Sequence, residues 1–493
     1  MVFSSTVFLF VFLPITLAGY YLLDRRFKNV FLLIVSLLFY AWGEPRFVFV
    51  MMGSILVNHV IALLIDRNLV KAEELAQSSS GAIYRRKAKL WLCLMVLFNL
   101  SLFFVYKYLN FTISNVNIIA KLFGMDGFKQ TNIALPIGIS FFTFQAMSYV
   151  FDVYYRKGQV QKNPLNTALY VSLFPQLIAG PIVRYETVAR EINSRRETFS
   201  DFAEGVRRFI CGLAKKVILS NSLAIIADYA FDRTVFSSLS VGMAWLGAVA
   251  YSLQIYFDFS GYSDMAIGLG RMFGFHFLEN FNYPYISKSV SEFWRRWHIS
   301  LGSWFRDYIY FPLGGSRVET KKRLVFNLFA VWFLTGVWHG AAWSFIAWGL
   351  MYFVLITFEK LTGMPGRLRH RWQQELYRIG TLLAVVLGWV IFRAEGLKKG
   401  LCYIASMFGL MGNKLTDAGA VFEFRSNIVI LVLSVLLSTP IVMKLGEKLQ
   451  NKLPEKLSYL RYSLSALLYL AIFVIAVSFT VTSTYNPFIY FNF

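Results

Sequence analysis

The chain has little of what water-soluble proteins place on their surfaces, and little of what small secreted proteins use to hold themselves together. Only 15% of its 493 residues are charged, against 57% that are hydrophobic. The three cysteines, Cys93, Cys211 and Cys402, are scattered, which excludes a disulfide framework and a zinc site. Neither a soluble surface nor intrinsic disorder fits this composition, so the sequence predicts an integral membrane protein.

Acidic residues are also scarce, because 27 Asp and Glu accompany 49 Lys and Arg, for a formal net charge of +22. Such a surplus of cations can indicate nucleic-acid binding, but here the cations lie in short loops between apolar runs. The sequence therefore predicts contact with membrane lipid and no nucleic-acid partner. Walker A, HExxH and EF-hand patterns are missing as well, so no metal and no bound cofactor is predicted.

Apolar runs of bilayer-spanning length recur along the whole chain. They predict an all-α polytopic membrane protein of about eleven or twelve transmembrane helices, with re-entrant or interfacial helices between them. The run 324–358 is too long for one span and carries Gly336 and Gly340 near its middle, so a tight hairpin or a broken helix is expected. The expected runs are 3–23, 31–43, 47–65, 90–106, 133–155, 205–230, 241–270, 324–358, 376–394, 426–446 and 460–482.

Loop cations predict which side of the membrane each segment faces. Segment 67–89 carries six Lys or Arg and segment 107–132 carries three, so the first is expected in the cytoplasm and the N-terminus outside. The same rule places the tail 482–493 outside. The run 3–23 precedes its cations, which is typical of an uncleaved first span.

The five histidines are few enough to compare one by one. His59, His276 and His370 are expected to be packed or surface residues. His339 differs, because it lies deep in the uncharged run 324–358 between small residues, and an ionisable group at that depth indicates function. An interhelical hydrogen bond is the structural alternative for His339.

His298 lies in a stretch that is rich in tryptophan and arginine, SEFWRRWHIS at 291–300. The pattern is typical of an interfacial amphipathic helix with its cations among lipid headgroups. The alternative is a cytoplasmic entrance, where Arg295, Arg296 and Arg306 bind the phosphates of coenzyme A or phosphopantetheine.

Two carboxylates, Asp258 and Asp264, lie within the apolar run 241–270. Their spacing of six is a poor match to one helical face, and the Ser-Gly pair between them is expected to break the helix. Carboxylates at this depth need an arginine, a backbone amide or water, and both are candidates for binding the substrate or the donor. A Ser–His–Asp relay through Ser260 or Ser263 is an alternative, although no nucleophile-elbow pattern accompanies it.

Four longer blocks are similar to signature sequences of the membrane-bound O-acyltransferase family. They read YFDFSGYSDMAIG at 256–268, NFNYPY at 280–285, FWRRWHISL at 293–301 and GVWHG at 336–340. The chain resembles most the bacterial branch that contains the membrane subunit of alginate O-acetylation. The resemblance covers nearly the whole chain, so we expect one domain over 1–493 with its catalytic core at 254–343.

The resemblance implies a ring-like helical bundle around a tunnel in a bacterial inner membrane. His339 is expected at its narrow point, His298 near its cytoplasmic side, and Trp297 and Trp338 beside the substrates. Members of this branch move an acyl group from a cytoplasmic thioester, acetyl-CoA or an acylated carrier protein, to hydroxyls of alginate, cellulose, peptidoglycan or similar glycans. A separate periplasmic or surface acetyltransferase is the implied partner. Because a hydroxyl attacks a thioester poorly, an imidazole such as His339 suits the role of general base.

The aromatic tail 482–493 ends in FIYFNF. Such an end is typical of an interfacial anchor. It also resembles the ending of the small peptide that accompanies the teichoic-acid member of the family, which implies that Tyr490 accepts the acyl group.

Two other functions are open to a chain of this kind. A transporter or flippase for a lipid-linked sugar would be favoured by an inverted repeat with paired broken helices, and none is visible. A scaffold subunit without chemistry would leave His339 unexplained.

Overall fold

The computed structural model describes residues 1–233, 235–452, 458–482 and 489. All regular secondary structure in these ranges is helical, which confirms the expected all-α class. The chain divides into two compact units. Unit 1 contains Met1–Val206 and Ala266–Leu278, and unit 2 contains Arg207–Met265 and Glu279–Phe493. Two helices contribute to both units, α10 (Phe199–Ala214) and α12 (Val241–Met272).

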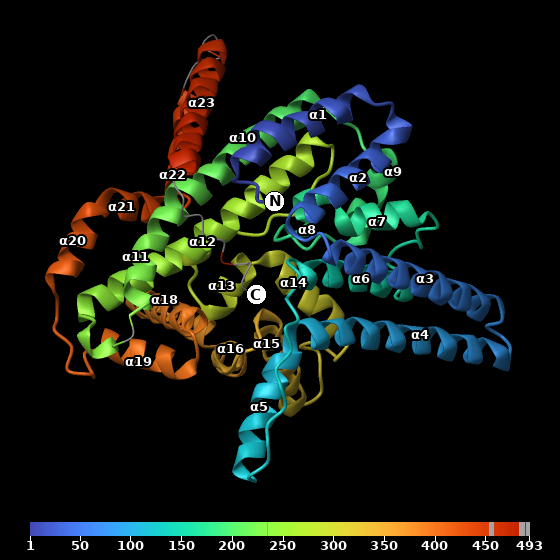
Figure 1. Cartoon of the computed structure of the whole chain (residues 1–493), viewed down its shortest axis with the longest axis horizontal. Helices are drawn as coiled ribbons and strands as arrows, with labels where there is room; N and C mark the ends of the chain where they lie inside the picture. The colour runs from blue at the N-terminus through green and yellow to red at the C-terminus, as the bar shows by residue number, and fades with distance from the viewer. Residues whose placement is uncertain (234, 453–457, 483–488, 490–493) are drawn as a thin grey trace. The chain divides into compact units, whose positions relative to one another are not determined.

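Unit 1 consists largely of the helices before residue 200. Within it α3 and α4 lie side by side as an antiparallel pair, and α6 packs against both (Figure 1). The helices are η1 (Phe8–Phe12), α1 (Leu13–Leu22), α2 (Arg25–Gly43), α3 (Phe47–Glu74), α4 (Ser79–Phe103), η2 (Phe104–Tyr108), α5 (Leu109–Leu122), α6 (Ile139–Tyr154), α7 (Pro164–Ser172), α8 (Phe174–Leu177) and α9 (Tyr185–Ser194).

Unit 2 contains the remaining helices. Its central contact is the antiparallel pair α15 and α16, with α13 and α18 packed against α16 (Figure 1). The helices are η3 (Lys215–Ser220), α11 (Asn221–Phe231), η4 (Phe236–Ser238), η5 (Pro284–Ile286), α13 (Val290–Arg296), α14 (Ile299–Phe305), η6 (Arg306–Tyr310), α15 (Lys321–His339), α16 (Trp343–Thr362), α17 (Met364–Arg367), α18 (Arg371–Arg393), α19 (Leu397–Met407), α20 (Ala418–Ser426), α21 (Ile428–Leu437), α22 (Ile441–Lys452) and α23 (Ser458–Thr482).

Among the described residues, seven helical stretches are long and apolar enough to cross a membrane, which confirms a polytopic protein. The pair α20 and α21 adds an eighth if its two helices, bent by 61°, count as one span. This number is below the expected one because several apolar runs fold as short or interrupted helices. The run 426–446, for example, divides between α21 and α22 around the Thr439-Pro440 pair.

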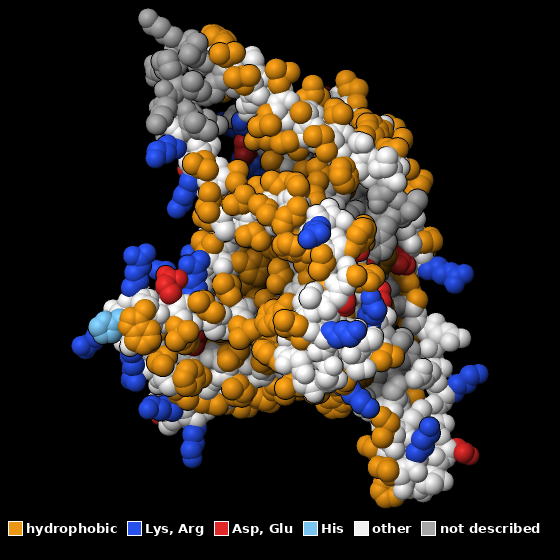
Figure 2. Space-filling model, turned by 90° about the vertical axis from the view of Figure 1, so that its left-hand side faces the viewer, with side chains coloured by type: hydrophobic (Ala, Val, Ile, Leu, Met, Phe, Trp, Pro, Cys, Tyr) orange, Lys and Arg blue, Asp and Glu red, His pale blue; other side chains and the backbone are white. Residues whose placement is uncertain are grey.

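The surface agrees with a lipid environment. Many large hydrophobic side chains are exposed on the spanning helices, among them Phe49, Leu97 and Val481. Figure 2 shows hydrophobic side chains over most of the face in view, with many of the Lys and Arg side chains projecting at its edges. In water such a surface would favour aggregation, whereas in a bilayer it is solvated by lipid tails.

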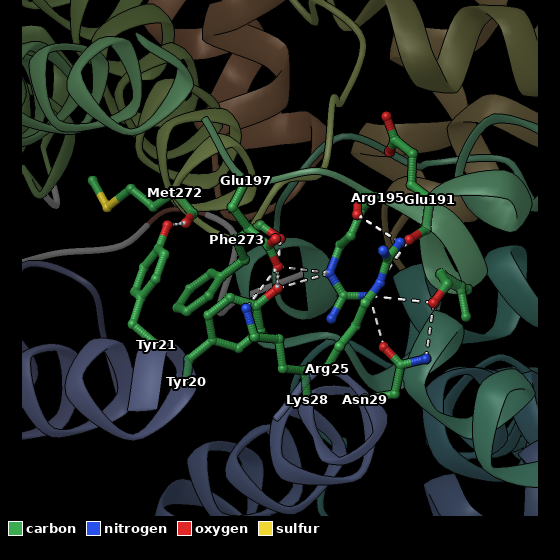
Figure 3. A network of polar contacts seen from close by, with 11 residues as sticks. Tyr20, Tyr21, Arg25, Lys28, Asn29, Glu191, Arg195, Glu197, Met272 and Phe273 are labelled. Atoms are coloured by element: carbon green, nitrogen blue, oxygen red, sulfur yellow. Dashed lines mark hydrogen bonds and ion pairs between the residues drawn. The ribbon is translucent and has the colours of Figure 1, made fainter. Parts of the chain in front are cut away.

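A polar network in unit 1 connects α1 and α2 with the segment after α9 (Figure 3). Arg195, whose side chain is 5% exposed, donates from Nε to the Tyr20 hydroxyl (2.8 Å) and from Nη1 to Asn29 Oδ1 (2.6 Å). Lys28 and Tyr20 both donate to Glu197. Burial alone would raise the pKa of Glu197, but these hydrogen bonds lower it below its usual value. We call these five residues the unit 1 network.

Candidate active site

His339 is the last residue of α15, where the chain turns into α16. Two glycines bring these helices into backbone contact. A Cβ on Gly336 would lie 2.6 Å from the Phe345 carbonyl oxygen, and one on Gly349 would lie 2.5 Å from that of Trp332. No larger residue fits at either position, so the expected hairpin within 324–358 is confirmed and closes tightly beside His339.

Aromatic rings surround the His339 imidazole, which is 5% exposed. Its ring centroid lies 4.8 Å from that of Trp338, 5.0 Å from that of Trp348 on α16, and 5.1 Å from that of Phe392 on α18. These edge-to-face contacts fix the ring and exclude water from it. The imidazole therefore lies in an apolar environment, where its interactions with a reacting group are strong.

His298 occupies the junction between α13 and α14 in a left-handed backbone conformation, with φ 45°. A non-glycine residue holds this conformation only where its surroundings enforce it. Here Asn280 Oδ1 accepts from the Ser300 N–H (3.1 Å), from the Ser300 hydroxyl (2.9 Å) and from His298 Nδ1 (3.1 Å). Because an amide oxygen only accepts, Nδ1 carries the proton and Nε2 carries the lone pair. Burial lowers the pKa of His298 to about 3, so the imidazole is neutral at physiological pH.

The two histidines lie on either side of one tryptophan. The Trp338 ring centroid is 6.2 Å from that of His298 and 4.8 Å from that of His339. We call His298, Trp338 and His339 the histidine cluster. It brings together two of the signature blocks, 293–301 and 336–340, and the Asn280 contact adds a third.

The tryptophan-rich segment is not a single interfacial helix, so that interpretation is wrong. α13 ends at Arg296, and α14 begins at Ile299 after the left-handed turn. Trp297 is 3% exposed and packs on Trp389 with a centroid separation of 4.7 Å. Its indole is therefore part of the apolar core, because burial in a ring cluster stabilises it more than an interfacial position would.

The three candidate donor-binding arginines differ in their contacts. Arg296 donates to Glu292 Oε1 (2.9 Å) and to the Asn282 carbonyl oxygen (3.1 Å). Arg306 contacts Asp307 (3.0 Å), yet 56% of its side chain is exposed. Arg295 is also exposed. The accessible guanidiniums are thus those of Arg295 and Arg306, whereas Arg296 holds α13 to the preceding loop.

The carboxylates of α12 each meet a lysine of the neighbouring π-helix η3. Asp264 contacts Lys215 Nζ at 2.6 Å and Arg208 Nη2 at 2.9 Å. Asp258 contacts Lys216 Nζ at 2.6 Å. α12 continues without interruption between them, so the expected helix break at the Ser-Gly pair is wrong. In the described part of the chain, the hydroxyls of the intervening serines 260 and 263 make no hydrogen bond, which argues against a Ser–His–Asp relay.

The histidine cluster lies within a region that matches a known family. The model of the membrane-bound O-acyltransferase family matches residues 79–404. The chain belongs to this family. A probable alginate O-acetylase AlgI of Pseudomonas aeruginosa is 45% identical over 83% of this chain and 75% of its own length. The protein of the same name in Pseudomonas putida is 39% identical over 100% of both chains. A peptidoglycan O-acetyltransferase of Helicobacter pylori is 36% identical over 84% of this chain and 81% of its own.

The sequence of this O-acyltransferase did not single out Asn280 or the two lysines. Asn280 is within a signature block, but only the fold shows that its amide holds both His298 and Ser300. Lys215 and Lys216 interrupt an apolar run, and two carboxylates interrupt another. Unpaired charges of opposite sign in two apolar runs are a signal that the runs pack together.

Two of the other three histidines have structural partners. His59 Nδ1 lies 3.0 Å from Thr167 Oγ1 inside unit 1. His276 contacts Glu191 Oε1 at 2.8 Å and Asp201 Oδ1 at 3.3 Å. The expected acyl acceptor, Tyr490, lies outside the described residues.

Proposed function

We propose that this O-acyltransferase takes acetyl from a cytoplasmic thioester and exports it for O-acetylation of an extracytoplasmic polysaccharide. The histidine cluster is the observation that carries the proposal, because two buried imidazoles beside one indole suit proton transfer in an apolar site. The names of the relatives, which refer to alginate and peptidoglycan, favour a cell-surface glycan as the final acceptor.

In the proposed reaction His339 is the general base. Its imidazole takes the proton of an acceptor hydroxyl while that oxygen attacks the thioester carbonyl, a C–O bond forms and the C–S bond breaks. The imidazolium then returns the proton to the leaving thiolate, so atoms and charge balance. His298, kept neutral by burial, offers its Nε2 lone pair as a hydrogen-bond acceptor that orients the donor.

The donor is acetyl-CoA or an acylated carrier protein, both of which carry phosphate. Arg295 and Arg306 are the side chains proposed to bind it, since guanidinium groups pair well with phosphate oxygens and both are exposed. No group of three or more His, Cys, Asp or Glu comes together as metal ligands in the described ranges, and the proposed chemistry uses none.

The immediate acceptor is proposed to be the Tyr490 hydroxyl. The residue before it, Ile489, is 9% exposed and belongs to the buried cluster that contains Trp348 and Phe392, the two rings packed on His339. A phenol with a pKa near 10 leaves more readily than an alcohol, so an acetyl-tyrosine would keep much of the transfer potential of the thioester. A separate periplasmic or surface acetyltransferase would then move the acetyl group to the glycan.

The loop cations support a bacterial inner-membrane protein with its N-terminus and its tail outside. In this arrangement the donor arrives from the cytoplasm and the acetylated tail faces the partner. The opposite orientation would leave the partner without access to the acetyl group.

Gene deletion with complementation tests the function. We expect the deletion strain to make its surface glycan in normal amount but without O-acetyl esters, and the wild-type gene to restore them. The Tyr490→Phe variant keeps the ring and lacks the oxygen, so it should insert normally and restore none. Loss of the glycan itself would favour the flippase, and full acetylation with Tyr490→Phe would refute the tyrosine relay.

A further inference from the structure

The contact between Lys216 and Asp258 is a deeply buried ion pair within unit 2. Their side chains are 2% and 1% exposed, and Nζ lies 2.6 Å from Oδ1. Removing two charges from water is costly, and an apolar pair of the same size is often at least as stable. A pair of this kind therefore suggests a task beyond holding two helices together.

The helices that carry the pair need no ion pair to approach each other. A Cβ on Gly212 would lie 2.5 Å from the Gly261 carbonyl oxygen, and one on Gly261 would lie 3.1 Å from the main-chain nitrogen of Lys216. The two backbones are thus already in contact at the crossing. Lys216 belongs to the π-helix η3, and such wide turns are frequent at functional sites.

The second oxygen of Asp258 binds the distant end of the chain. Oδ2 accepts the main-chain N–H of Ile489 at 2.9 Å, so one carboxylate joins a lysine and the tail. A hydrogen bond to the main chain fixes the register of a segment whatever its side chains are. The helix before the tail, α23, also packs against η3, which keeps the two partners in the same region.

The neighbouring carboxylate offers an internal comparison. Asp264 lies on the same helix and contacts Lys215 and Arg208, whereas Ile489, the described residue of the tail, is bound by Asp258. Each carboxylate meets a lysine of η3, but the contact with the tail is made by Asp258. The comparison is between an ion pair that joins α12 to its neighbouring helices and one that also binds Ile489.

We propose that Lys216 and Asp258 form a tail-binding ion pair, in which Asp258 is a positioning residue that docks the main chain at Ile489 and thereby presents the next residue for acyl transfer. Lys216 holds the carboxylate in place. Docking of the tail on Asp258 does not depend on the proposed transfer of acetyl through Tyr490. The role of Asp258 in acyl transfer does rest on that proposed function.

Two neutral replacements of the pair separate its charge from its hydrogen bond to the tail. Lys216→Gln/Asp258→Asn keeps an amide oxygen that accepts the Ile489 N–H. Lys216→Met/Asp258→Leu has similar volume and no acceptor, and Asp264→Asn is the control for charge removal from α12. Each is combined with Ile489→Cys after the native cysteines have been changed to serine, and maleimide labelling of the new thiol reports whether the tail is docked.

We expect labelling to be at least about tenfold faster in the Met/Leu variant than in the Gln/Asn variant, the Asp264→Asn control and the parent, at equal amounts of folded protein. Equally slow labelling in all four would overturn the docking. Glycan O-acetylation, measured in the same variants with Ile489 retained, should fall about tenfold or more in the Met/Leu variant and largely recover in the Gln/Asn variant, without a change in the KM for the donor. Fast labelling with full acetylation would overturn the positioning role.

The proposed transfer of acetyl through the Tyr490 hydroxyl is tested separately by Tyr490→Phe. If that variant remains active while its tail stays protected from labelling, the relay is refuted and the docking stands.

Discussion

The unit 1 network and the histidine cluster both bury polar side chains, but they satisfy them in opposite ways. In the unit 1 network each charge has a partner, as Arg195 shows with Tyr20 and Asn29. In unit 2 the imidazoles of His298 and His339 lie among aromatic rings, and burial rather than an ion pair controls the charge of His298. The first arrangement fixes structure. The second leaves two imidazoles in an apolar site, which suits the proton transfer that we propose.

The largest effect should come from removing the base. We expect His339→Ala to lower glycan O-acetylation by about 10²–10⁴-fold, the usual contribution of a general base, while the amount of protein in the membrane is unchanged. His59→Gln is the matched control, because His59 is also a buried histidine in an apolar helix but contacts Thr167. Esterified glycan is measured by base-labile acetate release. An equal loss of O-acetylation in both variants would show that the loss comes from changing any buried histidine, and would contradict a catalytic role for His339.

A second change gives the cluster the kind of partner that unit 1 uses. Asn280→Asp places a carboxylate at His298 Nδ1, which should raise the imidazole pKa from about 3 toward neutrality. The variant should then lose activity as the pH falls from 8 to 5, whereas the wild type should show no change from this group. Asn280→Ser changes the size of the side chain without adding charge and serves as the control. Superimposable pH profiles would contradict the assignment of His298 to the site.

Charge removal should distinguish the three arginines. We expect Arg295→Gln with Arg306→Gln to weaken binding of a non-hydrolysable acetyl-CoA analogue by about tenfold in detergent that contains no anionic lipid. Arg296→Gln should instead lower the thermal stability, because it removes the contacts to Glu292 and to the Asn282 carbonyl. Unchanged affinity in the double variant would assign both exposed arginines to lipid headgroups.

The smallest effect is expected at His276 of unit 1. Burial alone would lower the pKa of His276, but hydrogen bonds to Glu191 and Asp201 raise it above its ordinary value. The protonated His276 imidazole therefore stabilises the folded state. This stabilisation is fully present below the pKa of about 6.5 that His276 has in the unfolded chain, and it is lost as the pH rises through the higher pKa of the folded state. The melting temperature of the wild type should fall between pH 6 and pH 8.5 by on the order of one to two degrees more than that of His276→Gln. Parallel plots of melting temperature against pH for the two proteins would contradict this role of His276.

The features set by local residue type could be predicted from the sequence. The uncharged run 324–358 with its glycines predicted the hairpin, and the lone histidine in it indicated a candidate site, which stays a prediction. The tryptophans of 291–300 were misplaced because Trp suits an interface and a core alike, and only packing decides. The two ion pairs between lysines of η3 and carboxylates of α12 depend on the tertiary fold and have no local signal. The same is true of the contact of Asp258 with Ile489, 231 positions away.

The central claim is that the histidine cluster transfers acetyl to the C-terminal tail. Its most direct test is mass spectrometry of the C-terminal peptide after membranes that lack the partner acetyltransferase are supplied with isotopically labelled acetyl thioester. We predict a labelled acetyl group on Tyr490 in the wild type and none in His339→Ala. A tail without label in the wild type, or one labelled equally in both, would contradict the account.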